Sequence, residues 1–410
     1  MVLFLACAQP EERPDTRRSL PGDADTDTDT DADTDADSDA DADSDSDTDT
    51  VMACVADSDI RARCALSTAA DWATATLDDV EAGDSVTLAS SGLTAGTDTS
   101  GAYNGGTYAY GVVTSPPLEP GIDFDAAVPS WNAVTPAGTW ISLLMQARID
   151  GRWTDWYRLG VWASSTTDLD RHSFSNESDA DGDVWTDTLV LSQPAQAIRL
   201  QAVLFSADGV ARPTLSRLAV AVAENGARGS GAGGEAWGTI HAVPPRSQMV
   251  FDEGEAWCSP TSTSMLLAFH DVDVTVPEAA DGTWDEVYEG NGNWPFNVAY
   301  AASLGLTGEI GWFSSVADLE PWIAAGVPVA ISAEWGPGDL DGAPISSTDG
   351  HLLVVRGFTT DGDVAVNDPA SDSDATVSRT YDRDQLEDVW MNGSGGIAYL
   401  LWEGAERPVR

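Results

Sequence analysis

One cysteine in the C-terminal half stands where a nucleophile could be activated. Cys258 lies in the stretch EGEAWCSPTSTSMLLAFH, and Pro260 soon after it is typical of the first turn of a helix. A thiol at a helix N-terminus lies at the positive end of the helix dipole, which lowers its pKa and favours the nucleophilic thiolate. Because many structural cysteines also begin helices, this position alone does not establish catalysis.

A general base and a group to orient it are predicted on one hairpin. His351 opens the strand-like stretch HLLVVRGF, and the turn TDGD leads into the second stretch, DVAVNDP. If the two strands pair, His351 meets Asn367 and Asp368 at the same end of the sheet. A thiol, an imidazole and a carboxylate or amide are the parts of a Cys-His catalytic triad.

The elements that would position these residues are mixed. Helical patterns come first and strand-like patterns follow, which favours an α+β fold. Helices are expected at residues 259–270, 294–306 and 315–326, and strands at residues 328–332, 351–358, 363–368 and 396–402.

A β-rich region precedes this part of the chain. Between residues 70 and 225, short apolar stretches are separated by Gly, Pro, Asp and Ser, and apolar side chains alternate in AIRLQAVLF at 197–205. The pattern predicts an antiparallel β-sandwich. Its Trp residues are expected in the core, and a surface strip that binds a glycan or peptide is the alternative.

Composition divides the rest of the chain. Asp occupies every odd position from 23 to 49, so like charges keep that segment extended as a tether. The predicted segments are 1–21, a signal or lipoprotein remnant; 22–50, the Asp-rich tether; 51–69, a segment with a cysteine pair; 70–225, the sandwich-like domain; 226–240, a Gly-rich linker; and 241–410, the domain that carries Cys258.

The charge balance excludes one class of partner. The formal net charge is −49, and all 19 basic residues are Arg. Such a chain has no patch to neutralise phosphates, so nucleic-acid binding is not expected.

The cysteines suggest an exported protein. Cys54 and Cys64 are ten residues apart and are expected to form a disulfide, as in proteins from oxidising compartments. The stretch Leu5-Ala6-Cys7 resembles the end of a bacterial lipoprotein signal, with Cys7 as the possible lipid anchor. Cys258 is then expected to be a free thiol. The predicted location is extracellular or at the cell surface, with possible anchoring to the bacterial outer membrane.

Three motifs resemble a known family. The stretches SQMVFDEGEAWCSPTSTSMLLA, GHLLVVRGF and VNDP resemble papain-like cysteine peptidases related to the bacteriocin-leader, or double-glycine, peptidase family. The resemblance spans roughly residues 241–405. It implies Cys258 as nucleophile, His351 as general base, Asp368 as the group that orients the imidazole, and Gln248 as an oxyanion donor.

Two features depart from the family pattern. Ser259 follows the cysteine where the family has Gly, and the spacing of ten residues from Gln248 to Cys258 is longer than expected. The β-rich half is similar to the sandwich-like region that precedes such domains in some exported bacterial proteins. The expected fold is therefore multidomain: an N-terminal all-β sandwich-like domain, then an α+β papain-like cysteine peptidase domain.

These expectations define the function to be tested. The leading prediction is a cysteine peptidase that hydrolyses the amide bonds of a peptide or protein substrate through an acyl-enzyme, without a cofactor or metal. The alternative is a surface binding protein with an inactive peptidase-like domain. A third possibility is acyl or isopeptide transfer, in which an amine replaces water.

Overall fold

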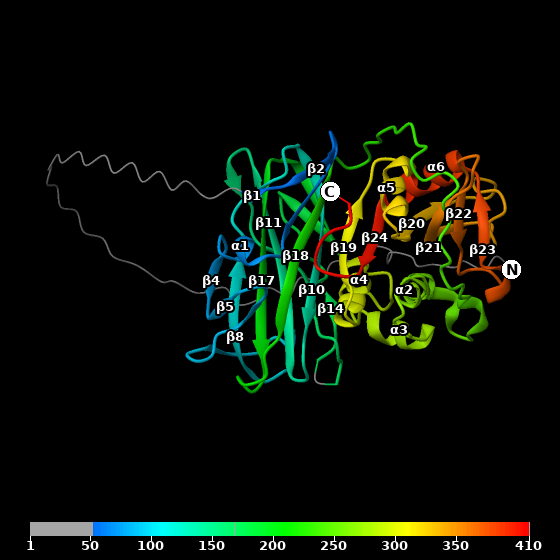
Figure 1. The fold of residues 1–410 in the computed structure, drawn as a ribbon. Helices are drawn as coiled ribbons and strands as arrows, with labels where there is room; N and C mark the ends of the chain where they lie inside the picture. Colours follow the sequence, from blue (N-terminus) through cyan, green and yellow to red (C-terminus); the bar gives the residue numbers. More distant parts are fainter. Residues whose placement is uncertain (1–51, 168, 410) are drawn as a thin grey trace, which may run out of the picture. The chain divides into compact units, whose positions relative to one another are not determined.

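The computed structural model describes residues 52–167 and 169–409. Its N-terminal part contains two β-sheets, and its C-terminal part contains helices and a third sheet (Figure 1). The predictions for residues 1–21, including Cys7, and for the tether 22–50 fall outside the described residues.

The first sheet has ten strands, and the pairing of β17 with β11 is its longest. In β17 (Ala197–Ser206), Ile198 and Leu200 are buried while Arg199 and Gln201 are partly exposed, which is the alternation expected from the sequence. The other strands are β1 (Met52–Ala53), β4 (Thr76–Asp78), β7 (Thr94–Thr97), β8 (Thr107–Thr114), β9 (Leu118–Glu119), β11 (Thr139–Ile149), β12 (Arg152–Trp153), β13 (Tyr157–Trp162) and β14 (His172–Ser173).

The second sheet has eight strands and confirms the predicted β-rich N-terminal region. Its strands are β2 (Val55–Ser58), β3 (Arg61–Leu66), β5 (Val80–Ala82), β6 (Val86–Leu88), β10 (Phe124–Val134), β15 (Gly182–Trp185), β16 (Thr188–Ala195) and β18 (Thr214–Ala223). A short helix, α1 (Ala69–Trp72), follows β3.

The sheet begins earlier in the chain than the sequence indicated. β3 pairs with β18, and Cys64 within β3 forms the expected disulfide with Cys54. The cysteine pair therefore holds an edge of the second sheet, and it does not form a separate segment.

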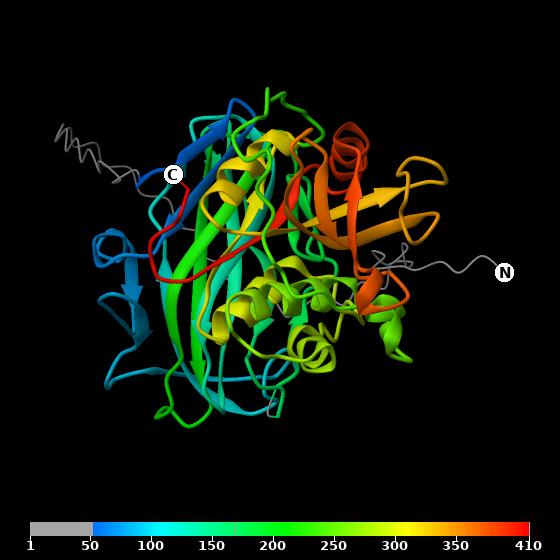
Figure 2. The ribbon, with the colours of Figure 1, turned by 45° about the vertical axis from the view of Figure 1, so that its right-hand side comes forward.

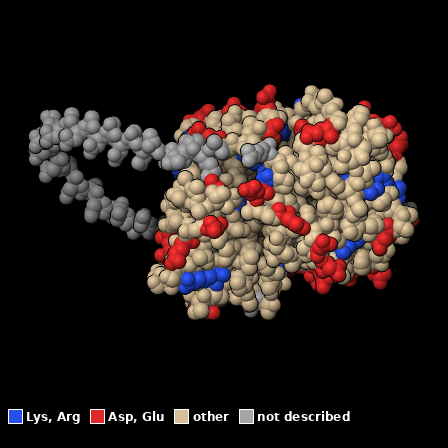
Figure 3. Space-filling view, viewed as in Figure 1, with Lys and Arg blue, Asp and Glu red and all other residues tan. Residues whose placement is uncertain are grey.

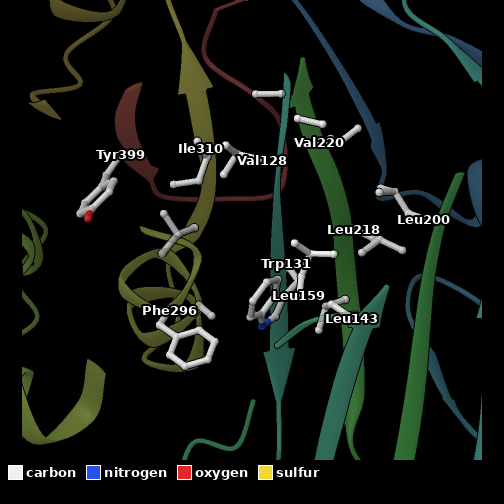
Figure 4. Close-up of a cluster of buried hydrophobic side chains, with 14 of the residues drawn as sticks. Val128, Trp131, Leu143, Leu159, Leu200, Leu218, Val220, Phe296, Ile310 and Tyr399 are labelled. Atoms are coloured by element: carbon white, nitrogen blue, oxygen red, sulfur yellow. The ribbon is translucent and has the colours of Figure 1, made fainter. Parts of the chain in front are cut away.

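One apolar core continues from the sheets into the C-terminal part. Leu200 of the first sheet and Leu218 of the second are both buried in it (Figure 4). The ring of Phe296 lies 6.1 Å from that of Trp131 and 5.4 Å from that of Trp162. Both Trp side chains are buried, so they form core and not a ligand-binding strip.

The C-terminal part places helices before a six-stranded antiparallel sheet. The helices are α2 (Cys258–Phe269), α3 (Val276–Thr283), α4 (Trp294–Ser303), α5 (Glu320–Ala324) and α6 (Arg383–Gly393), with short 3₁₀ turns η1 (Gln248–Val250), η2 (Gly254–Ala256), η3 (Val316–Leu319) and η4 (Asp374–Thr376). The strands are β19 (Thr307–Trp312), β20 (Val329–Trp335), β21 (Thr348–Phe358), β22 (Val364–Asn367), β23 (Ser378–Tyr381) and β24 (Ile397–Trp402).

The Gly-rich segment between the two parts is bound to the C-terminal part. The carboxylate of Glu320 accepts hydrogen bonds from the backbone of Gly234 and Ala236 and from Nε1 of Trp237. The segment predicted as a linker is thus held against the C-terminal part by these hydrogen bonds.

Strands β10 and β19 lie side by side where the two parts meet (Figures 1 and 2), and paired polar groups join them. The amide of Asn132 donates to the Gly308 carbonyl at 2.7 Å and accepts from the Gly308 N–H at 3.1 Å. Nearby, the Arg217 guanidinium lies 3.3 Å from the Glu309 carboxylate. These buried contacts fix the C-terminal sheet against the N-terminal one.

Acidic side chains are spread over both parts on the face seen in Figure 3, and basic side chains form only small groups there. This matches the net charge of the sequence. Within residues 52–167 and 169–409, none of the helices has the length and apolar character needed to cross a membrane.

Candidate active site

Helix α2 places Cys258 near the start of strand β21. Cys258 is the first residue of the helix. One turn later, Ser262 Oγ donates a hydrogen bond of 3.1 Å to the carbonyl of Leu352, the residue after His351. Because residues i and i+4 lie on the same helix face, Cys258 and Ser262 both face this strand.

The far end of the helix shows that it runs alongside β21 in the same direction. The ring of Phe269 lies 5.8 Å from that of His241, and the His241 N–H donates to the Arg356 carbonyl. The helix C-terminus is thus near the end of β21, so its N-terminus lies at the His351 end.

Cys258 is buried and covalently bonded in this structure. Its side chain is 1% exposed, and it is disulfide-bonded. The expectation of a free thiol is therefore wrong for this structure. A disulfide sulfur is not a nucleophile, so any attack by Cys258 requires that this bond first be reduced.

The hairpin of β21 and β22 brings His351 and Asp368 together. His351 Nε2 lies 2.8 Å from Asp368 Oδ1, and both side chains are buried. The pairing of Val354 with Asn367 sets this register. Asn367, the other residue that the sequence placed here, instead donates its side-chain amide to the Val243 carbonyl.

Two further donors hold the Asp368 carboxylate. Tyr381 Oη donates to Oδ2 at 2.6 Å, and the Ala370 N–H donates to Oδ1 at 3.0 Å. Burial by itself would raise the pKa of Asp368, but the His351 charge and the hydrogen bonds outweigh it, so the pKa lies below its usual value. The carboxylate therefore stays ionised behind the imidazole.

Sequence reasoning missed Tyr381 and Trp335. Tyr381 reaches the carboxylate because β23 pairs with β22, and no motif marks that pairing. The Trp335 ring meets the His351 ring edge-on, with centroids 5.4 Å apart and planes at 90°. Trp335 follows a register shift in the pairing of β20 with β21, which the sequence does not reveal.

Gln248 lies next to the segment that follows Asp368 and to the turn before Cys258, and its side-chain amide is hydrogen-bonded to backbone carbonyls. Its backbone N–H donates to the Pro369 carbonyl, and its Nε2 donates to the carbonyls of Gly254 and Glu255, each at 2.9 Å. Its Oε1 is buried without a hydrogen-bond partner among the described residues. In this conformation Gln248 holds the turn before Cys258, and its oxyanion role stays a prediction.

The serine that replaces the family glycine has a defined partner. Ser259 Oγ lies 2.8 Å from the Tyr399 hydroxyl, and both groups are buried. The pair ties the first turn of α2 to β24. Among the described residues, no group of three or more His, Cys, Asp or Glu side chains could hold a metal ion.

Two family comparisons match this architecture. Residues 62–223 match the Peptidase C39 N-terminal domain, and residues 240–396 match the Peptidase_C39 like family. The chain carries domains of the peptidase C39 family. The expected resemblance to the double-glycine peptidases is thereby confirmed. No curated protein matches the chain.

Two solved structures are similar to part of the chain. One is a C39-like peptidase from Bacillus anthracis, with 18% identity, a TM-score of 0.32, and coverage of 41% of this chain and 98% of that one. The other is a double glycine motif protease from an AMS/PCAT transporter in complex with the leader peptide, with 17% identity, a TM-score of 0.27, and coverage of 41% and 95%.

Proposed function

We propose that this protein is a papain-like cysteine peptidase that hydrolyses peptide bonds through Cys258, His351 and Asp368. The observation that carries the proposal is the buried contact between His351 and Asp368, 2.8 Å long. It lies at the end of β21, the strand alongside which α2 packs. The C39 match supports a peptide as the substrate class.

The chemistry follows the general logic of cysteine hydrolases. The reduced Cys258 thiolate attacks the substrate carbonyl, and His351 gives its proton to the leaving amine. Water then attacks the acyl-enzyme while His351 takes the water proton, and the acid product leaves Cys258 free again. Because Nε2 of His351 faces Asp368, Nδ1 is the nitrogen that exchanges protons with sulfur, amine and water.

The developing oxyanion needs donors. Helix α2 supplies N–H groups at its first turn, and Trp257, its N-cap residue, makes no side-chain capping bond to them. Gln248 would add a donor if its amide turned away from the Glu255 carbonyl.

Location is part of the proposal. A disulfide such as Cys54–Cys64 persists in oxidising compartments, which supports export. The proposed reaction needs Cys258 as a reduced thiol in such a compartment. Lipid anchoring at Cys7 stays a prediction.

Proteome-wide cleavage profiling tests the function. The full chain, with and without dithiothreitol, is compared with Cys258→Ala and His351→Ala, and with His172→Ala as a control for loss of a histidine outside the site. We expect cleavage only after reduction, and a loss of about a thousandfold or more in both site variants. Equal cleavage by wild type and Cys258→Ala would remove the peptidase assignment.

A further inference from the structure

A cavity lies between the β-rich part and the C39 part. Its volume is about 350 Å³, within the range of pockets that hold small ligands or side chains. The turn from β15 to β16 lines one side with Trp185 and Asp187, and β20 and β21 line another with Glu334 and Asp349. Neither part of the chain encloses it alone.

Neighbours of His351 line the cavity, while His351 itself is not one of the lining residues. Asp349 and Gly350, which line it, directly precede His351 in β21, and Ala333, which also lines it, is the partner of His351 in β20. A chain bound for attack beside His351 could therefore place one of its side chains in this cavity.

The cavity wall carries negative charge. The exposed carboxylates of Glu334 and Asp349 line it, and neither pairs with an Arg among the described residues; Asp187 also lines it, but it is buried and its pKa is raised to about 7. Burial raises the pKa of Glu334, and the nearby negative charge of Asp349 adds to this effect. A bound cation would relieve that repulsion.

Two Arg side chains that contact cavity-lining residues are already engaged. The guanidinium of Arg61, stacked on Trp312, donates to backbone carbonyls such as that of Gly395, and Arg228 is held by Asp388 and Asn392. Neither Arg61 nor Arg228 is therefore free to neutralise the carboxylates of the cavity.

Aromatic rings complete the lining. Trp185 is 53% exposed, and its Nε1 donates to Asp183, which fixes the ring at the rim. Trp294 lies across the cavity wall, and its backbone N–H donates to Asp187 at 2.7 Å. Exposed indole faces attract organic cations, most of all the guanidinium group.

We propose that this cavity is a subsite that takes a cationic side chain, Arg or Lys, of the peptide substrate. The inference rests on the proposed peptidase function and adds a preference to it. It also gives the N-terminal domain a role in selecting substrate, because Trp185 and Asp187 come from that domain.

Hydrolysis tests the preference in the reduced full chain. Peptide mixtures that carry either Arg or Met at one fixed position near the scissile bond are compared by kcat/KM. We expect about a tenfold preference for Arg at one position. Glu334→Gln and Asp349→Asn should each reduce the Arg-to-Met ratio about threefold, the size of an exposed ion pair. Asp84→Asn removes an equal charge from the exposed β5–β6 turn and should leave the ratio unchanged.

Direct binding separates this inference from the peptidase assignment. Acetyl-arginine amide and acetyl-methionine amide are titrated into Cys258→Ala by calorimetry, with and without Glu334→Gln. Tighter binding of the arginine amide that weakens in Glu334→Gln supports the subsite even if no peptide is cleaved. Cleavage without any Arg preference, together with equal binding of the two amides, overturns the subsite and leaves the peptidase in place.

Discussion

Asp187 and Asp368 show how environment alone sets the charge of the same side chain. Both are buried. Asp368 has the charge of His351 beside it, and its pKa is lowered despite burial. Asp187 accepts from the Trp294 N–H and the Thr188 hydroxyl, but burial dominates and the Asp285 charge adds to it, which raises its pKa to about 7. For a buried carboxylate, hydrogen bonds without a neighbouring cation do not offset the free-energy cost of losing hydration.

A pH-dependent stability follows from Asp187. Its pKa is about 7 in the folded protein and about 3.9 in an unfolded chain, so between these values the folded state binds more protons. Its contribution to stability is therefore largest below about pH 4 and declines as pH rises to about 7, by about 1.4 kcal/mol for each unit of pKa difference. Asp187→Asn should flatten this decline.

Urea unfolding between pH 4.5 and 8 measures the effect, with the exposed Asp84→Asn as control. If wild type and Asp187→Asn lose stability in parallel over this range, Asp187 is not the group responsible.

At the scale of elements, the turn before α2 determines where Cys258 stands. The η1 and η2 turns fold so tightly that a Cβ added at Gly254 would lie 1.8 Å from the Gln248 carbonyl oxygen. The Gln248 amide in turn holds the carbonyls of Gly254 and Glu255. Glycine at 254 is thus required by close backbone approach.

Gly254→Ala should disturb this turn. We expect a loss of about 1–3 kcal/mol in the free energy of unfolding, as for other overpacked sites, and a fall in the hydrolysis that depends on Cys258. Gly83→Ala is the matched control, because a Cβ there meets nothing within 4 Å. Equal stability and activity in the two variants would show that the turn tolerates expansion.

At the scale of the whole molecule, Arg61 joins the two parts. It comes from β3 and is buried, and its guanidinium donates to the carbonyls of Phe313 and Gly395 in the C39 part as well as to Glu224 and Ala227. Burial lowers its pKa to about 10. The shared apolar core crosses the same boundary. We therefore expect the two parts to unfold in one cooperative transition.

Arg61→Met tests this coupling by calorimetry. Each carbonyl left buried without a donor costs about 1–3 kcal/mol, so the variant should lose several kcal/mol or unfold in two steps. Arg152→Met, which removes an exposed Arg paired with Asp181, should cost less than about 1 kcal/mol. A thermogram of Arg61→Met that matches the Arg152→Met thermogram would contradict the role of Arg61.

The sequence by itself determined the features that arise from neighbouring residues. The alternation in residues 197–205 indicated a half-buried strand, and the TDGD turn joined two strands whose lengths bring His351 and Asp368 to the same end of the hairpin. Pro260 marked the start of α2. Neither α3 nor α6 was predicted from the sequence.

Only the tertiary structure decided which distant groups share a site. Tyr381 reaches Asp368 through strand pairing, and Trp335 contacts His351 after a register shift. Trp185, from the N-terminal part, lines a cavity together with residues of the C39 part. These contacts depend on how separate elements pack, and packing is set by many side chains at once. Spacing along the chain therefore predicted the hairpin that holds the base but not the groups that surround it.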